Sequence, residues 1–310
     1  MSQKPTGKPR PAAAGSPAEG DGAPLGESTL DLARRVEQNR EAILASPTYR
    51  LAEIDIDFLG RSEQRPVRMQ HELLKTETLL RENKISTTIV VFGGTQIVPR
   101  EEAEARLARA RLHLKDAPDD VRRRREVARA ESVLQKSHYY DEAREFARIV
   151  SSVCQTNGKC DFVVTTGGGP GVMEAANRGA FDVGAKSVGF NIELPHEQEP
   201  NPYITPELCF QFHYFAMRKF HFLLRAAALV VFPGGFGTFD ELFDTLTLRQ
   251  TGRMQEIPII LYGHDYWNRM INFQALADEG VIADEHLDLL HYADTPQEAW
   301  EIIAEFHGVK

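Results

Sequence analysis

The sequence predicts a doubly wound parallel α/β sheet with helices on both faces. Short, continuous apolar runs such as 87–92 and 257–262 alternate with amphipathic stretches of ten or more residues. This alternation is typical of buried parallel strands joined by helical crossovers. Two further apolar runs, at 161–165 and 229–232, lead directly into glycine-rich turns. Because ligands of such sheets bind at the carboxyl ends of the strands, these turns predict where a site lies.

The part of the chain before residue 87 is expected to differ from the sheet domain. It begins with a stretch dense in Pro, Gly, Ala and Ser, which cannot bury enough apolar surface to offset the entropy of ordering. Two helical stretches follow, one ending at Ser46-Pro47 and one over about 65–83. The expected segments are a disordered tail (1–28), an N-terminal helical accessory segment (29–86), an α/β domain (87–310) and, within that domain, a charged helical insert (about 100–136).

The α/β domain is expected to alternate strands and helices along its whole length. Strands are expected at 87–92, 161–165, 187–190, 210–214, 229–232 and 257–262. Helices are expected at 139–153, 172–182, 217–227, 267–279 and 296–307. A further helix is expected after the last glycine turn, where Thr238 can cap a helix that starts with acidic residues. This order of elements is Rossmann-like.

Charge patterning disfavours nucleic acid and membranes as partners. The formal net charge of −9 argues against attachment to nucleic acid or to an anionic membrane by net charge. The four-arginine run at 122–125 invites a nucleic-acid interpretation. Within the insert, however, eight acidic residues interleave with eleven basic ones, and no aromatic side chain accompanies them. A solvated helix face or an oligomer contact is therefore the favoured interpretation.

The three cysteines, Cys154, Cys160 and Cys209, lack the spacing of a metal site or a redox pair. They are interpreted as reduced thiols, which predicts a cytoplasmic protein. No apolar run reaches about 18 residues, the length of a membrane span, and the N-terminus lacks the apolar region of a signal peptide. No His/Asp cluster has metal-ligand spacing, so no metal and no cofactor are expected.

Two glycine-rich turns predict an anion site built from backbone. They are Gly167-Gly168-Gly169-Pro170-Gly171 and Pro233-Gly234-Gly235-Phe236-Gly237. Neither fits the G-x-G-x-x-G dinucleotide fingerprint, and neither has the lysine of a Walker phosphate loop. A glycine turn that opens a helix presents free N–H groups and partial positive charge, which suits a mononucleotide or a sugar phosphate. The alternative is a pair of tight strand-to-helix turns that bind no ligand.

Glu241 and Arg218 are the candidate reactive side chains near these turns. Thr238-Phe239-Asp240-Glu241 fits a capping box, in which the glutamate only returns a hydrogen bond to the helix start. Alternatively, a carboxylate close to a phosphate turn can stabilise a sugar cation or orient a water while a glycosidic bond breaks. Arg218 can likewise engage a phosphate bidentately or form a surface ion pair.

Three motifs of the chain resemble the LOG ("Lonely guy") family. They are Gly-Gly-Gly-Pro-Gly-Val-Met-Glu-Ala at 167–175, Met-Arg-Lys at 217–219 and Pro-Gly-Gly-Phe-Gly-Thr-Phe-Asp-Glu at 233–241. The resemblance covers about residues 87–310, apart from the insert. Members are nucleoside 5'-monophosphate phosphoribohydrolases, many once labelled possible lysine decarboxylases. The resemblance implies hydrolysis of the N-glycosidic bond of AMP, or of an N6-modified AMP (a cytokinin precursor), to free base and ribose 5-phosphate. It also implies a homo-oligomer.

The resemblance further implies roles for individual residues. Arg218 and Glu241 would be catalytic. The substrate-binding residues would be Gly168, Gly169, Gly171, Met173, Glu174, Glu197, Lys219, Gly234, Gly235, Phe236, Gly237, Thr238, Asp240 and Thr247. Phe92-Gly93-Gly94-Thr95 stands where the family has a glycine-serine turn, and the N-terminal segments and the insert are additions. The chain therefore resembles a longer bacterial-type member, and the preferred base is left open.

Two other functions are compatible with these residues. A nucleotide-binding or carrier protein of the same fold would hold the nucleotide without hydrolysing it. A lysine decarboxylase would need a pyridoxal phosphate Schiff base on a lysine. Lys219 is the only lysine in the three motifs, and its place beside Arg218 favours a nucleotide contact instead.

Overall fold

The structure is a computed structural model and describes residues 28–155, 161–194 and 199–309. The tail expected to be disordered, 1–28, lies outside the described residues except for Ser28. The chain divides into two compact units, Met1–Gln64 and Arg65–Lys310. Among the helices of the described residues, none combines the length and apolar character needed to cross a bilayer.

The first unit consists of short helical elements. They are α1 (Thr29–Ala45), η1 (Pro47–Tyr49), α2 (Ile56–Leu59) and η2 (Ser62–Gln64). Ser28 caps α1, because its side chain accepts a hydrogen bond from the backbone N–H of Asp31 at 3.2 Å. Ser46 ends α1 and also caps η1 through the N–H of Thr48. The apolar residues of α1 stay exposed, since the helix buries none of its residues.

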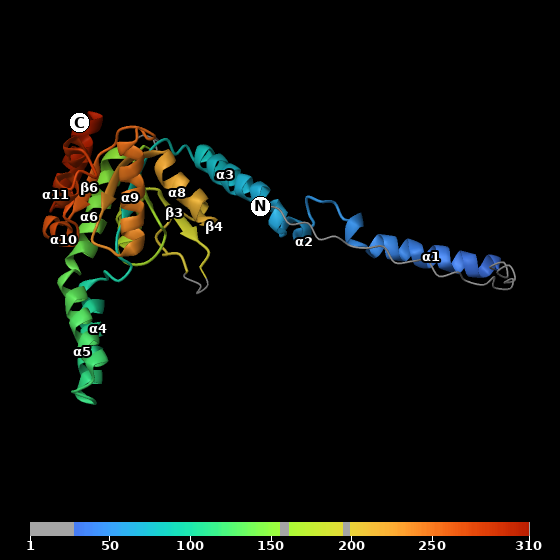
Figure 1. The fold of residues 1–310 in the computed structure, drawn as a ribbon, viewed down its shortest axis with the longest axis horizontal. Coiled ribbons are helices and arrows are strands. Elements are labelled where there is room, and N and C mark those ends of the chain that lie inside the picture. The colour runs from blue at the N-terminus through green and yellow to red at the C-terminus, as the bar shows by residue number, and fades with distance from the viewer. Residues whose placement is uncertain (1–27, 156–160, 195–198, 310) are drawn as a thin grey trace, which may run out of the picture. The chain divides into compact units, whose positions relative to one another are not determined.

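The second unit is built on a seven-stranded parallel sheet, which confirms the predicted fold class (Figure 1). Its strands are β1 (Thr88–Phe92), β2 (Val163–Thr166), β3 (Ser187–Ile192), β4 (Cys209–Phe212), β5 (Ala226–Val231), β6 (Ile259–Tyr262) and β7 (Leu290–Ala293). The strand order is β4-β3-β2-β1-β5-β6-β7. The chain thus runs outward from β1 to β4, crosses back, and continues from β5 to β7. The order reverses between β1 and β5, which is where open parallel sheets bind ligands.

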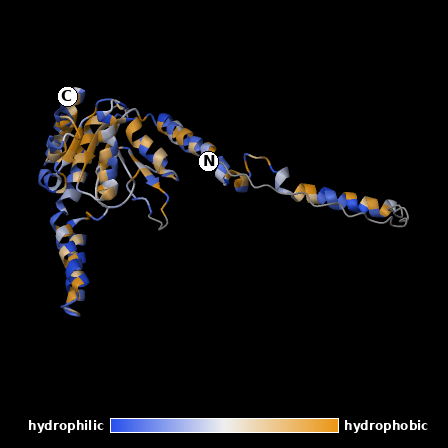
Figure 2. Ribbon diagram, in the orientation of Figure 1, coloured by the Kyte–Doolittle hydropathy of each residue, from blue (hydrophilic) through white to orange (hydrophobic). Residues whose placement is uncertain are grey.

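Helices cover both faces of the sheet. One face packs against α6 (His138–Cys154), α7 (Val172–Asp182) and α12 (Pro296–His307). The other packs against α3 (Arg65–Glu82), α8 (Phe215–Leu224), α9 (Phe236–Gln250), α10 (His264–Met270) and α11 (Phe273–Asp278). Two 3₁₀ turns, η3 (Pro206–Leu208) and η4 (Asp284–Leu289), complete the unit. Burial on both faces explains why the central strands are apolar throughout rather than alternating, as Figure 2 shows.

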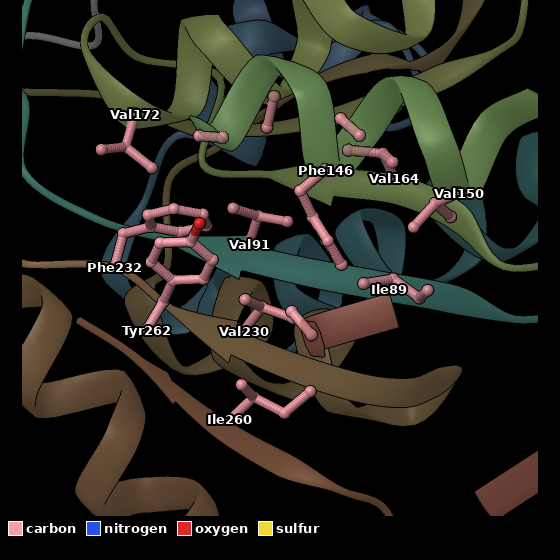
Figure 3. Packing of buried hydrophobic residues seen from close by; sticks show 14 of the residues in the cluster. Ile89, Val91, Phe146, Val150, Val164, Val172, Val230, Phe232, Ile260 and Tyr262 are labelled. Atoms are coloured by element: carbon pink, nitrogen blue, oxygen red, sulfur yellow. The ribbon is translucent and has the colours of Figure 1, made fainter. Parts of the chain in front are cut away.

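The face that carries α6 and α7 is closely packed. Phe232, at the end of β5, stacks on Tyr262 of β6 with ring centroids 4.2 Å apart. Figure 3 shows these two rings beside Val172 of α7, with Phe146 of α6 above β1. Close packing is also required between α6 and α7, because a Cβ at Gly179 would lie 2.1 Å from the carbonyl oxygen of Arg144.

The charged insert forms two helices that pack on each other, α4 (Arg100–Lys115) and α5 (Val121–Gln135). Several of its arginines pair with the interleaved carboxylates. Arg111 joins the two helices through Glu131 at 2.9 Å, and Arg124 pairs with Asp119 at 2.7 Å. Much of the positive charge of the insert is thus matched within the insert.

Several elements differ from the sequence prediction, among them α8, the α10–α11 pair and β7. The helix expected over 217–227 ends at Leu224, because Ala226 and Ala228 pair with β1 in register with Thr88 and Ile89. The helix expected over 267–279 is two helices, and Asn272 caps the second through the N–H of Ala275. The edge strand β7 was not expected, because its sequence Leu-His-Tyr-Ala is short and partly polar.

The contact between α6 and α7 predicts the effect of one methyl group. Gly179→Ala should lower the free energy of unfolding by about 1–3 kcal/mol, because the added methyl overpacks the interface. The matched control is Gly237→Ala, a helical position at which a Cβ meets no atom within 4 Å. Urea unfolding of both variants tests this, and equal midpoints would contradict it.

Candidate functional site

A cavity of about 410 Å³ opens at the carboxyl ends of β1, β2, β3 and β5, where the strand order reverses. It is lined by Phe92, Gly93, Gly94, Thr95, Gly167, Gly169, Met173, Asn191, Ile192, Leu194, Phe215, Arg218, Gly235, Phe236, Gly237, Thr238, Asp240 and Glu241. Both predicted glycine turns and both predicted catalytic residues therefore meet in one cavity.

The turn after β5 leaves room at its tip. A Cβ at Gly235 or Gly237 would meet no atom within 4 Å, whereas one at Gly234 would lie 2.1 Å from Thr238 Oγ1. Gly234 is thus required for packing inside the turn, and the other two glycines face open space at the start of α9. Free N–H groups at a helix N-terminus with no side chain in front of them are suited to an anion.

The turn after β2 is held from behind by buried polar side chains. Asn201 binds it through two contacts: its N–H donates to Gly168 O at 2.9 Å, and its Nδ2 donates to Gly169 O at 3.1 Å. The same Nδ2 donates to Asn177 Oδ1 of α7 at 3.0 Å. Thr166 Oγ1 also donates to Asn177 Oδ1, at 2.7 Å. Gly171 has a φ of 74°, and a Cβ there would lie 2.3 Å from Gly94 O. The turn therefore requires glycine at that position.

Arg218 is fixed against the sheet rather than free on the surface. Its Nε donates to the carbonyl oxygen of Phe190 at 2.7 Å, and its Nη2 donates to that of Gly167 at 3.4 Å. Its guanidinium carbon lies 5.1 Å from the centroid of the Phe222 ring, a cation–π contact. Burial lowers the pKa of Arg218, and the charge of Glu241 opposes this change. The surface ion pair considered for this residue is not the arrangement found.

Glu241 is a buried carboxyl group with a strongly altered acidity. The residue is 7% exposed. Burial raises the pKa of Glu241 to about 7, against the lowering effect of Arg218 and Lys219. A carboxyl group with a pKa near neutrality, next to a cation and inside a cavity, is characteristic of functional sites.

The capping interpretation of Glu241 is wrong in its geometry. α9 begins at Phe236 with Gly235 as its N-cap, so Thr238 lies inside the first turn, and no side chain caps this helix. The cause is the glycine turn itself, which lets the chain enter the helix three residues earlier than a threonine cap would. In α12, by contrast, Thr295 and Glu298 form a full capping box. Glu241 is therefore buried without being needed for the helix start.

Several predicted substrate-binding residues lie beside the cavity rather than on its wall. Lys219 Nζ pairs with Asp240 Oδ1 at 2.7 Å, and Glu174 accepts a hydrogen bond from Tyr140 at 2.6 Å. Thr247 donates to the backbone carbonyl of Phe243, one turn earlier in α9. Gly168, Gly171 and Gly234 also lie outside the lining, where they shape the turns. Glu197 lies outside the described residues.

Three side chains of the lining were missed from the sequence: Asn191, Ile192 and Phe215. Asn191 and Ile192 end β3, which extends two residues beyond the predicted strand, and Phe215 starts α8 two residues before the predicted helix. These residues lie at or just after the carboxyl end of a strand, where ligands of parallel sheets bind, so this rule could have identified them. The turn 92–95 follows the carboxyl end of β1 and also lines the cavity.

Parts of the chain are similar to known proteins. Residues 173–303 match a family model described as possible lysine decarboxylase. A probable cytokinin riboside 5'-monophosphate phosphoribohydrolase, LOGL3 of Oryza sativa subsp. japonica, is 26% identical over 156 residues, covering 46% of this chain and 68% of the relative. The Arabidopsis thaliana enzyme of that name, LOG3, is 26% identical over 149 residues, covering 46% and 67%.

Among solved structures, the molybdenum cofactor carrier protein of Chlamydomonas reinhardtii superposes with a TM-score of 0.41 at 18% identity, covering 72% of this chain and 98% of that one. The molybdenum cofactor binding protein of Rippkaea orientalis has a TM-score of 0.37 at 19% identity, covering 54% and 87%. The family model and the curated relatives confirm the resemblance to the LOG family that the glycine turns and the Arg218-Lys219 pair predict.

Proposed function

We propose that this chain is a nucleoside 5'-monophosphate phosphoribohydrolase acting on AMP or an N6-modified AMP. The proposal rests above all on Glu241, a buried carboxyl group whose pKa is raised to about 7 in a cavity that also holds Arg218 and the open N-terminus of α9. The names of the curated relatives support the same activity. In the reaction, water adds to C1' of the ribose, the N-glycosidic bond breaks, and the base leaves with a proton.

The N-terminus of α9 would bind the 5'-phosphate. The backbone N–H groups over 235–238 point out of a helix start that has no side-chain cap, and the Cβ positions of Gly235 and Gly237 are open. A dianion there replaces the missing cap and interacts favourably with the helix dipole. Phosphate binding at this point would place the ribose next to Glu241.

Glu241 and Arg218 would divide the chemistry at the sugar. The ionised carboxylate of Glu241 stabilises the oxocarbenium-like ribose and orients the attacking water, as carboxylates do in glycoside hydrolysis. Arg218 stabilises the negative charge that develops on the departing base. Its guanidinium already faces the cavity, held by Phe190 O and Gly167 O, so it does not need to reorganise during the reaction.

Lysine decarboxylation is disfavoured by the state of Lys219. Burial lowers the pKa of Lys219, but the hydrogen bond that its ammonium donates to Asp240 and the charges of the nearby carboxylates outweigh this and raise the pKa. A lysine that forms a Schiff base needs the opposite change, toward the neutral amine. A carrier function is distinguished by experiment, because a carrier would bind AMP without releasing adenine.

We further propose a homo-oligomeric protein of the cytoplasm. Large apolar side chains are exposed on α8 and α9, namely Phe215, Phe220, Leu224 and Phe243, which supports contact with a second copy. Light scattering of the purified protein would give its mass. Cys154 and Cys209 are free thiols, which supports a reducing compartment.

Replacing the carboxylate of Glu241 by an amide should have opposite effects on catalysis and on stability. Glu241→Gln should lower kcat for base release from AMP at least about 100-fold, because the amide cannot stabilise the cationic sugar. It should also raise the free energy of unfolding at pH 8 by on the order of 3 kcal/mol, because a neutral amide replaces a carboxylate buried at a pKa of about 7. The exposed Glu285→Gln is the control. Near wild-type release of adenine by Glu241→Gln, followed by chromatography, would contradict the assignment.

The acidity of Glu241 predicts the pH dependence of the reaction. The ionised form is the active one, so kcat/KM should rise with pH through about 7 and then level off. Stability changes in the opposite direction: the folded state holds this proton more tightly than the unfolded chain, so the contribution of Glu241 falls as pH rises from about 4.5 through 7. Glu241→Gln should lose the rate step near pH 7 and keep only the titration of the substrate phosphate near pH 6. A profile that is unchanged in this variant would contradict the prediction.

The open glycines predict a binding defect without a folding defect. Gly235→Ala and Gly237→Ala should each weaken AMP binding at least about tenfold, because a methyl group would occupy the place of a phosphate oxygen. The free energy of unfolding should change by less than about 1 kcal/mol, since no protein atom lies within 4 Å of either Cβ. Calorimetric titration with AMP measures the affinity, and unaltered affinity in both variants would place the phosphate elsewhere.

A further inference from the structure

α8 sets the position of two cavity residues, Phe215 and Arg218. Both lie in its first turn, and the N–H of Arg218 donates to Tyr214 O at 3.1 Å. The N-cap residue Tyr214 provides no side-chain cap to the helix. The start of α8 therefore depends on groups outside the helix, and the groups that bind it also determine the position of Arg218.

α3 holds the start of α8. The Glu72 carboxylate accepts hydrogen bonds from two backbone N–H groups, that of His213 at 2.7 Å and that of Tyr214 at 3.4 Å. Arg68 Nε donates to the hydroxyl of Tyr214 at 3.0 Å. A carboxylate at this place does the work of a cap and interacts favourably with the helix dipole.

α3 also holds the end of α8. Arg225, the C-cap residue, forms a two-point ion pair with Glu77, with Nη1 to Oε1 at 2.5 Å and Nη2 to Oε2 at 2.8 Å. The two side chains are only 18% and 19% exposed. A bidentate pair shielded from water is geometrically strict, unlike an exposed one. Thr76 and Leu80 of α3 are buried, and Leu80 belongs to the core of the sheet domain.

We propose that α3 is a positioning element of the site, and that Glu72 and Glu77 are positioning residues that act through Arg218. Both ends of α8 are fixed from one helix, and α3 lies outside the span matched by the family model, residues 173–303. The N-terminal extension thus contributes to the geometry of the cavity without touching it. The kinetic part of this inference rests on the proposed hydrolysis.

The test uses Glu72→Ala and Glu77→Gln in the full chain, with the exposed Glu82→Gln of the same helix as matched control. Hydrogen exchange of 213–225 should become at least about tenfold faster in the first two variants, while β5 and α9 keep wild-type rates. For base release from AMP, kcat should fall about tenfold, with KM changed less than about twofold, because the phosphate is bound by α9 and not by α8. Glu72→Gln, which keeps an oxygen acceptor for the N–H groups, should retain at least half of the wild-type kcat.

Faster exchange of 213–225 with unchanged kcat would overturn the inference, because α3 would then stabilise α8 without serving the site. Equal loss in Glu82→Gln would also overturn it. If the wild-type chain binds AMP but releases no adenine, the proposed function fails, and the inference is decided separately. In that case the exchange of 213–225 must still be faster in Glu72→Ala and Glu77→Gln, with the AMP affinity within about twofold of wild type because α9 binds the phosphate, and wild-type exchange rates in both variants would overturn the positioning role.

Discussion

The parallel pairing of β1 with β5 is the constraint on which the site depends. It brings two strands distant in sequence into register, with Val90 opposite Leu229, and so brings their terminal turns together. Gly94 then connects three turns through backbone alone: its N–H donates to Pro233 O at 2.9 Å, and its carbonyl accepts from Val172 N at 3.3 Å. Side chains at Gly93 or Gly171 would separate these turns, because their Cβ atoms would lie within 3 Å of neighbouring atoms.

The cavity combines this rigid backbone with an unfavourable charge arrangement. Glu241 is buried where the strand order reverses, and Arg218 only partly compensates for its lost hydration. The pKa of this carboxyl group is therefore raised to about 7. Arg218 is itself partly desolvated, and its guanidinium donates hydrogen bonds to the carbonyl oxygens of Phe190 and Gly167. Such an arrangement does not arise from the demands of packing, since an apolar pair of the same volume would fold at least as well. A buried Glu241 and Arg218 are expected in a binding site, where a substrate would provide the polar contacts that the protein does not.

The sequence predicted the fold class, most strands and helices, and the two glycine turns, because each follows from local chemistry. Continuous β-branched runs identify buried strands, and glycine clusters identify turns. It misjudged Thr238, since the entry of the chain into α9 depends on a turn geometry that residue types do not encode. It also missed Asn191 and Phe215, whose place on the cavity wall depends on where an element ends. β5 starts at Ala226 because of its pairing with β1, against the helical preference of alanine.

The Glu77–Arg225 pair joins residues 148 positions apart in the chain. The loop that it closes contains β1 to β4, the insert and the first glycine turn. Contacts of such separation form only after a large entropic cost of loop closure has been met, and they slow folding. During synthesis, α3 is complete once residue 82 has been added, but α8 can reach its final position only after residue 225 has emerged from the ribosome. Among the described residues this is one of the most non-local contacts, and it holds the helix that carries Arg218, so that helix can be fixed only after β1 to β4 have been synthesised.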